Sequence, residues 1–121
     1  MANSQEITKA IAAHSIWKVR LAEAIHAGQS DTTPERVAPD NLCDFGKWLY
    51  SLPPSERNRE HWKKVQALHA AFHKEAAKLL KLALSGQKAE AEKCMAFGGS
   101  YRKASADLTT AMMAWKKAIE S

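Results

Sequence analysis

The sequence predicts an all-α protein: an antiparallel four-helix bundle with three long helices and one short second helix that carries a cysteine. Three observations predict this class. Apolar residues recur at three- and four-residue steps over three long stretches. Glycines and prolines separate the stretches, and no stretch alternates apolar and polar residues as a half-buried strand would. Long helices joined by short connections pack most simply as an antiparallel bundle.

The first helix is expected to begin at Asn3 or Ser4, either of which can cap it, and to end at Gly28. Its apolar residues share one face. His14 lies within roughly 20° of Leu21 around the helix axis, at about 100° per residue. His14 is therefore predicted to point into the core.

The short second helix follows an irregular connection. Residues 28–40 contain two prolines, which prevent a continuous helix through them. Asp40 or Asn41 can cap the second helix, which places Cys43 within it and ends before the next Pro-Pro pair. Gly46 in its middle is unfavourable for a helix, so we expect a close approach of two backbones there.

Two long helices complete the predicted bundle. The third begins at Ser55 and ends at Gly86, with His69 and His73 on its buried face. The fourth would be about 33 residues and about 50 Å long, with Gly98-Gly99 as a kink or a close contact. Its near-heptad apolar positions are Cys94, Phe97, Tyr101, Ala104, Leu108, Ala111, Trp115 and Ile119. Its overhang beyond the first helix predicts a partner surface.

Composition indicates one soluble domain over residues 1–121. No run approaches the 18 to 20 apolar residues of a membrane helix, and the first residues do not form a basic-then-apolar leader. Two cysteines do not make a disulfide framework. We therefore expect a cytoplasmic protein that does not insert into a membrane.

The net charge of +5 raises the question of nucleic-acid binding. The lysines of the third helix lie away from its apolar stripe, and aromatic residues that could stack on bases do not interleave with them. These residues are Lys63, Lys64, Lys74, Lys78 and Lys81. A solvated helix face explains them, and nucleic-acid binding is not expected.

The histidines and Cys43 predict a metal site. His69-x-x-x-His73 places two imidazoles about one turn apart on one face, so that both can bind one ion. His14 and Cys43 lie on or beside the core from two other elements. Three histidines and one cysteine complete the tetrahedral ligand set that zinc favours. The alternative, core histidines with an inert cysteine, requires a separate hydrogen-bond partner for each buried imidazole.

The same residues carry a resemblance to a known family. His14, then Cys43-x-Phe-Gly-x-Trp48, then His69-x-x-x-His73, at these separations, resemble the chemoreceptor zinc-binding (CZB) domain. The resemblance implies a commonly dimeric four-helix bundle that binds zinc through three histidines and one cysteine. It also implies regulation of a bacterial signalling module, a chemoreceptor or a diguanylate cyclase, although neither module is present in this chain. The implied ligands are His14, Cys43, His69 and His73, and the implied packing positions are Trp17, Gly46 and Trp48.

The sequence does not favour a di-iron centre or a zinc hydrolase. Glu23-x-x-His26 has di-iron spacing but lacks the second motif that such a centre needs. Ala70-Ala71-Phe72 between the histidines offers no general base for a zinc hydrolase, so an enzyme is not expected. Two hypotheses stay open: a sensor of zinc or of an oxidant such as hypochlorous acid, with Cys43 as the redox reporter, and a purely structural, zinc-stapled dimerisation module. Cys94 is expected in the core, and His26 and His61 at the surface.

Overall fold

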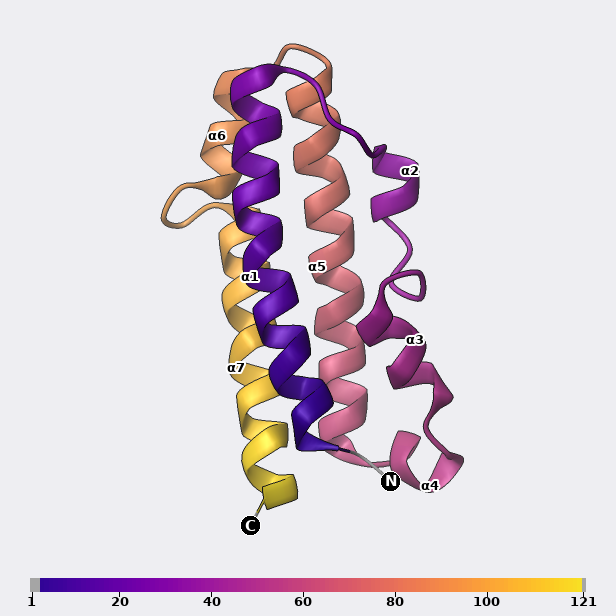
Figure 1. The fold of residues 1–121 in the computed structure, drawn as a ribbon. Coiled ribbons are helices and arrows are strands. Elements are labelled where there is room, and N and C mark those ends of the chain that lie inside the picture. Colours follow the sequence, from indigo (N-terminus) through magenta and orange to yellow (C-terminus); the bar gives the residue numbers. More distant parts are fainter. Residues whose placement is uncertain (1–2, 121) are drawn as a thin grey trace.

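The computed structural model describes residues 3–120, and every regular element within that range is a helix, which confirms the all-α class. Three helices are long: α1 (Ser4–Ala27), α5 (Glu60–Leu84) and α7 (Ser100–Glu120). Four are short: α2 (Pro34–Val37), α3 (Asp44–Ser51), α4 (Pro54–Arg57) and α6 (Lys88–Met95). In Figure 1, α1 and α5 run in one direction, and α6 and α7 run back. Helix α5 contacts every other helix and forms the centre of the fold.

The predicted ends of α1 are confirmed. The Asn3 side chain accepts a hydrogen bond from the Gln5 backbone N–H and caps the helix. Gly28 ends it in the left-handed conformation, with φ of 71°, which a residue with a β-carbon adopts only at a cost. Ile7, Leu21 and the other apolar residues of its inner face are buried, as is His14.

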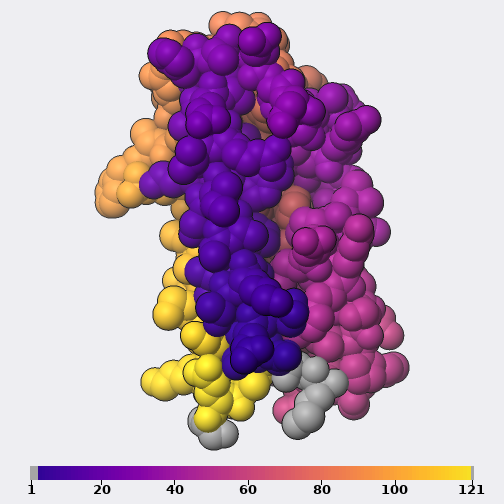
Figure 2. All heavy atoms as spheres, viewed as in Figure 1, coloured from indigo at the N-terminus to yellow at the C-terminus, as the bar shows by residue number. Residues whose placement is uncertain are grey.

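The segment between α1 and α5 differs from the prediction, because it contains three short helices rather than one. Residues 28–40 are not wholly irregular: Pro34 opens α2, since the first helical position needs no backbone donor. Ser55 lies in α4, and the long helix begins only at Glu60. In Figures 1 and 2 these short helices lie along one side of the molecule, where all three contact α5 and α3 also contacts α1. They take the place of the single short second helix that was expected.

Helix α5 follows the predicted apolar stripe. Val65, His69, His73 and the apolar residues one and two turns further on are buried, whereas Leu84 at the end of the stripe is exposed. The five lysines assigned to its solvated face are all exposed. The exposure of Leu84 follows from its position in the last turn.

The prediction of one continuous fourth helix is wrong. Residues 96–99 separate α6 from α7, and Gly98 there has a φ of 85°. A β-carbon at Gly99 would overlap the carbonyl oxygens at the end of α6, which confirms the close contact expected at the glycine pair, and the pair allows a sharp turn rather than a kink. Phe97, one of the near-heptad apolar positions predicted to face the core, is 92% exposed. Helix α7 alone spans about 32 Å, less than the about 36 Å of α1, and the predicted overhang disappears.

The other predicted apolar positions of this region face the core. Tyr101, Leu108, Ala111 and Trp115 of α7 are buried, and Cys94, Ala104 and Ile119 are half-buried. Among residues 3–120, each helix is too short or too polar to cross a membrane.

Candidate metal centre

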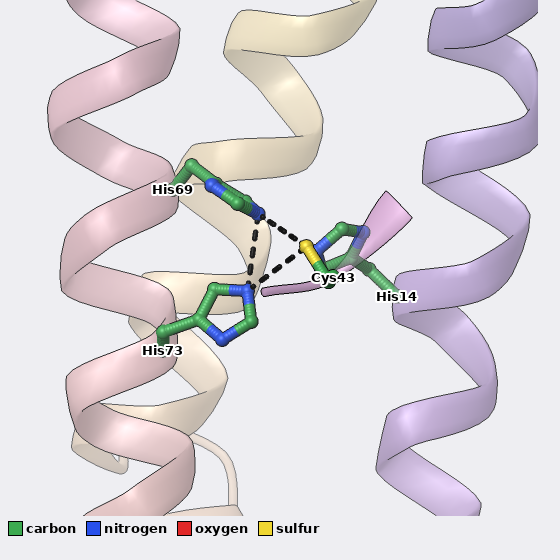
Figure 3. A group of neighbouring side chains, drawn as sticks. All are labelled: His14, Cys43, His69 and His73. Atoms are coloured by element: carbon green, nitrogen blue, oxygen red, sulfur yellow. Dashed lines mark hydrogen bonds between the residues drawn. The ribbon is translucent and has the colours of Figure 1, made fainter. Parts of the chain in front are cut away.

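The four predicted ligands come together from three separate parts of the fold. His14 lies in the middle of α1, Cys43 immediately precedes α3, and His69 and His73 lie one turn apart on α5. Figure 3 shows the sulfur and the three imidazoles pointing toward one another. Their candidate ligand atoms all lie within 4.8 Å of one another. The tertiary structure thus assembles the group that the sequence predicted.

The distances within the group suit a tetrahedral ion. Zinc bonds of about 2.0 to 2.1 Å to nitrogen and about 2.3 Å to sulfur, at tetrahedral angles, place two nitrogens about 3.3 Å apart and a sulfur about 3.6 Å from each nitrogen. The Nε2 atoms of His69 and His73 are 3.1 Å apart. The Cys43 Sγ lies 3.4 Å from the Nε2 of His69 and 3.5 Å from that of His73. The separations of these three ligand atoms are therefore close to the edge lengths of a tetrahedron around zinc.

Backbone carbonyls orient two of the imidazoles. The Nδ1 of His14 is 2.7 Å from the Ala10 carbonyl oxygen, and the Nδ1 of His73 is 2.8 Å from that of Val37. A carbonyl oxygen only accepts, so each Nδ1 carries the proton and each Nε2 keeps a free lone pair. The Nε2 of His14 is buried without a hydrogen-bond partner among the described residues. A metal ion would satisfy this orphaned nitrogen, so the residues present fit the predicted zinc ion.

Burial keeps the imidazoles neutral. It lowers the pKa of His14 to about 4 and, with His73 and His14 as neighbours, that of His69 to about 2. The pKa of His73 is also lowered by burial. Burial raises the pKa of the Cys43 thiol, against the opposing effect of the Gly46 N–H. Neutral imidazoles are the form that binds a cation, and a divalent ion would supply the charge that a buried thiolate needs.

The position of Cys43 relative to its helix differs from the sequence prediction. It is the N-cap of α3 rather than a residue inside the helix, and neither Asp40 nor Asn41 has that role. The Gly46 backbone N–H points to the Cys43 Sγ at 3.3 Å. A β-carbon at Gly46 would overlap the Asp40 carbonyl oxygen, which confirms the predicted close approach of two backbones. That approach brings the sulfur toward α5.

Aromatic side chains surround the group. The Phe72 ring lies 4.9 Å from the His14 ring, and the Phe45 ring lies 5.1 Å from the His69 ring, both edge to face. Trp48 packs on Phe45 and on Trp115 of α7, as its predicted packing role requires. Phe72 was not singled out from the sequence, although its place between the two histidines of the stripe was a usable signal.

Cys43 is not sealed from solvent. A groove of about 500 Å³ between the first half of α1 and the start of α3 is lined by Ala13, His14, Trp17, Cys43 and Phe45 among others. Cys43 is half-buried, whereas His69 and His73 are buried. Trp17 is half-buried at this groove rather than deep in the core. A small reactant could therefore approach Cys43 from this side.

Three polar residues considered in the sequence, Glu23, His26 and His61, lie outside the group of candidate ligands. Glu23 and His26 are exposed and make no second metal cluster with the described residues. His61 is also exposed, as predicted. The two histidines therefore remain apart from the buried site.

A family model matches the part of the chain that holds this group. The model of the chemoreceptor zinc-binding domain matches residues 14–80, more than half of the chain. The chain belongs to this family. All four candidate ligands of this CZB domain lie within the matched segment, which begins at His14, whereas α6 and α7 lie outside it. No curated protein and no solved structure matches the chain.

Proposed function

We propose that this CZB domain binds one zinc ion through His14, Cys43, His69 and His73, and that the state of this site regulates a signalling partner. The observation that carries the proposal is the convergence of one sulfur and three imidazole nitrogens within 4.8 Å of one another. Bound zinc would hold the Cys43 sulfur as a thiolate and link three parts of the chain. Four protein ligands close the coordination shell, so we expect a regulatory site rather than a catalytic one.

Metal analysis of purified protein tests the ligand set. Protein never exposed to a chelator should contain one zinc per chain, and zinc should raise its melting temperature, because the ligands span elements that separate on unfolding. Cys43→Ala and His73→Ala should lose most of the affinity. The matched control is His61→Ala, which removes an exposed histidine from the same helix as His73. Zinc near zero in the wild type, or full affinity in Cys43→Ala, would sink the assignment.

We further propose that Cys43 reports oxidants. Its sulfur is the ligand that is readily oxidised, and the groove beside α1 gives it an approach from solvent. With hypochlorous acid, the thiolate sulfur loses two electrons and takes up the hydroxyl group as a sulfenic acid, while chloride leaves. The sulfenic acid is a weaker zinc ligand, so the Cys43 link between α3 and α5 would be released.

Stoichiometric hypochlorous acid added to zinc-loaded protein tests this step. Zinc release should parallel modification of Cys43, followed by mass spectrometry. Cys94 and Met113 serve as internal controls, since Cys94 is half-buried far from the predicted ligands in sequence and Met113 is exposed. If Met113 oxidises while Cys43 stays reduced, zinc availability becomes the better candidate for the signal.

The structural alternative predicts a different outcome. In a zinc-stapled module, zinc stays bound at every physiological concentration of free zinc and oxidant. Helix α3 does not depend on the sulfur alone for its position, because Phe45, Leu49 and Leu52 are buried and the Trp62 indole N–H donates to the Leu49 carbonyl. Zinc occupancy measured across the physiological range of free zinc and oxidant, with hydrogen exchange of α3 at each point, separates the hypotheses. A sensor loses zinc and changes the exchange of α3 within that range, whereas a staple keeps its ion and α3 does not change.

The last part of the proposal concerns the oligomeric state and the signalling module that the domain controls. We propose a cytoplasmic homodimer that controls chemotaxis or cyclic-di-GMP signalling through a chemoreceptor module or a diguanylate cyclase, and in which each chain forms an antiparallel four-helix bundle. Ile16 and Val19 of α1 are large apolar residues left exposed, and they support a buried partner face. Sedimentation should give a dimer at micromolar concentration, and only monomer would contradict this part.

A further inference from the structure

A chain of polar side chains lies behind His69, on the side away from the sulfur. Asp40 lies in the turn between α2 and α3. Its Oδ2 accepts a hydrogen bond from the Tyr50 hydroxyl at 2.6 Å. The Tyr50 oxygen in turn accepts one from the Gln66 side-chain amide at 3.0 Å. The same Asp40 oxygen lies 4.0 Å from the Nδ1 of His69. Two helices thus hold one carboxylate opposite a predicted ligand.

His69 differs from the other two histidines in what its Nδ1 faces. Those of His14 and His73 contact backbone carbonyl oxygens, whereas that of His69 is buried without a hydrogen-bond partner among the described residues. Its side chain is fully buried, so water does not replace the missing partner from bulk solvent. A buried nitrogen left in this state is unfavourable. Asp40 presents the carboxylate that can satisfy it.

We propose that Asp40 is a positioning residue for the metal site: it accepts the Nδ1 proton of His69 and thereby directs the Nε2 lone pair to the ion, with Tyr50 and Gln66 holding the carboxylate in place. The inference rests on the proposed zinc function. It requires an approach of about 1 Å from the observed 4.0 Å to reach hydrogen-bond distance. Metal-bound histidines generally donate their second ring proton to such a carboxylate or carbonyl, which fixes the tautomer and the ring orientation.

Charge balance favours a carboxylate over a neutral group at this position. A divalent ion with one thiolate and three neutral imidazoles leaves a net positive charge in a buried site. Asp40 is the acid that faces His69, and its side chain is only 20% exposed, so its negative charge is partly shielded from water and acts at short range. The hydrogen bond from Tyr50 to the carboxylate, and the one from Gln66 that holds Tyr50, make that position specific. An amide in its place would keep the shape and lose the charge.

The test compares Asp40→Asn and Tyr50→Phe with the control Asp44→Asn. Asp44 is exposed and adjoins Cys43, so its replacement removes the same charge near the site without touching His69. Zinc affinity, measured by competition with a chromophoric chelator, should fall about 10- to 100-fold in Asp40→Asn. It should fall less in Tyr50→Phe and change little in Asp44→Asn. Tyr50→Phe keeps the proposal testable if Asp40→Asn does not fold.

A second readout separates positioning from a merely structural role. In zinc-loaded wild type, the His69 Nδ1 proton should give a slowly exchanging, downfield NMR signal, which should shift upfield and exchange faster in Asp40→Asn. A structural role would lower the melting temperature of the zinc-free variant and leave this signal unchanged. Unchanged affinity and signal in Asp40→Asn, with a wild type that binds zinc, would overturn the role of Asp40 alone. A wild type without zinc affinity would overturn the proposed function as well.

Discussion

Replacing Gly46 with alanine should destabilise the zinc-free protein by about 2 kcal/mol, although alanine is the better helix former. A β-carbon there would overlap the Asp40 carbonyl oxygen and lie 2.8 Å from its carbonyl carbon and 3.0 Å from the Asn41 α-carbon. All three neighbours are backbone atoms, so a rotamer change cannot relieve the clash. Overpacking of this kind costs about 1 to 3 kcal/mol, and here about 3 because the backbone must move. The gain in helix propensity returns about 0.5 to 1 kcal/mol.

The effect should extend to the metal site. Gly46 donates its N–H toward the Cys43 sulfur, and Asp40 faces His69, so separating the two backbones displaces both. Urea denaturation of zinc-free protein, followed by circular dichroism, gives the free energy of unfolding, and an unchanged slope would show that the unfolded state is unaltered. Lys47→Ala is the control, because Lys47 is exposed on the same helix and its replacement should change stability by less than about 0.5 kcal/mol. A Gly46→Ala protein as stable as the wild type would refute the close contact and the reasoning built on it.

Three further predictions concern pH, a core hydroxyl and the turn between α6 and α7. The pKa of His14 is lowered to about 4 and that of His69 to about 2, below the usual 6.5, so below pH 6.5 the unfolded zinc-free chain takes up protons that the fold excludes. As the pH is lowered to 4, the free energy of unfolding should then fall by about 1.4 kcal/mol per pH unit for each histidine. Denaturant titrations in the presence of a chelator measure this, and a free energy that does not change with pH would contradict the burial of the two histidines. Tyr101→Phe should leave the melting temperature unchanged or raise it, because the buried Tyr101 hydroxyl has no hydrogen-bond partner in the described structure; a clear fall would indicate a partner such as water. Gly99→Ala should lower the free energy of unfolding by about 1 to 3 kcal/mol, because its β-carbon would overlap backbone carbonyls of α6, and an exposed Lys103→Ala change should not.

Local patterns in the sequence were sufficient for the ends of α1, the buried stripe of α5 and the identity of the four candidate ligands. Asn3 and Gly28 act through hydrogen bonds and dihedral angles within a few residues, so their roles can be recognised without the fold. His69 and His73 share a face because a helix turns once in 3.6 residues. The Cys43 motif and its spacing from these histidines then predicted the site and the family. In each of these cases the information is periodic or local.

Contacts between segments decided the rest. Cys43 became a helix cap because the Asp40 carbonyl fits against Gly46, which only the packed turn reveals. The same turn placed Asp40 beside His69, although nothing in an aperiodic segment indicates which way a carboxylate points. Phe97 fits the heptad spacing of its neighbours but lies outside the core, because the glycines after it allow the chain to leave the helix. Apolar periodicity records which residues could share a face, whereas the conformation of a break depends on the atoms that surround it.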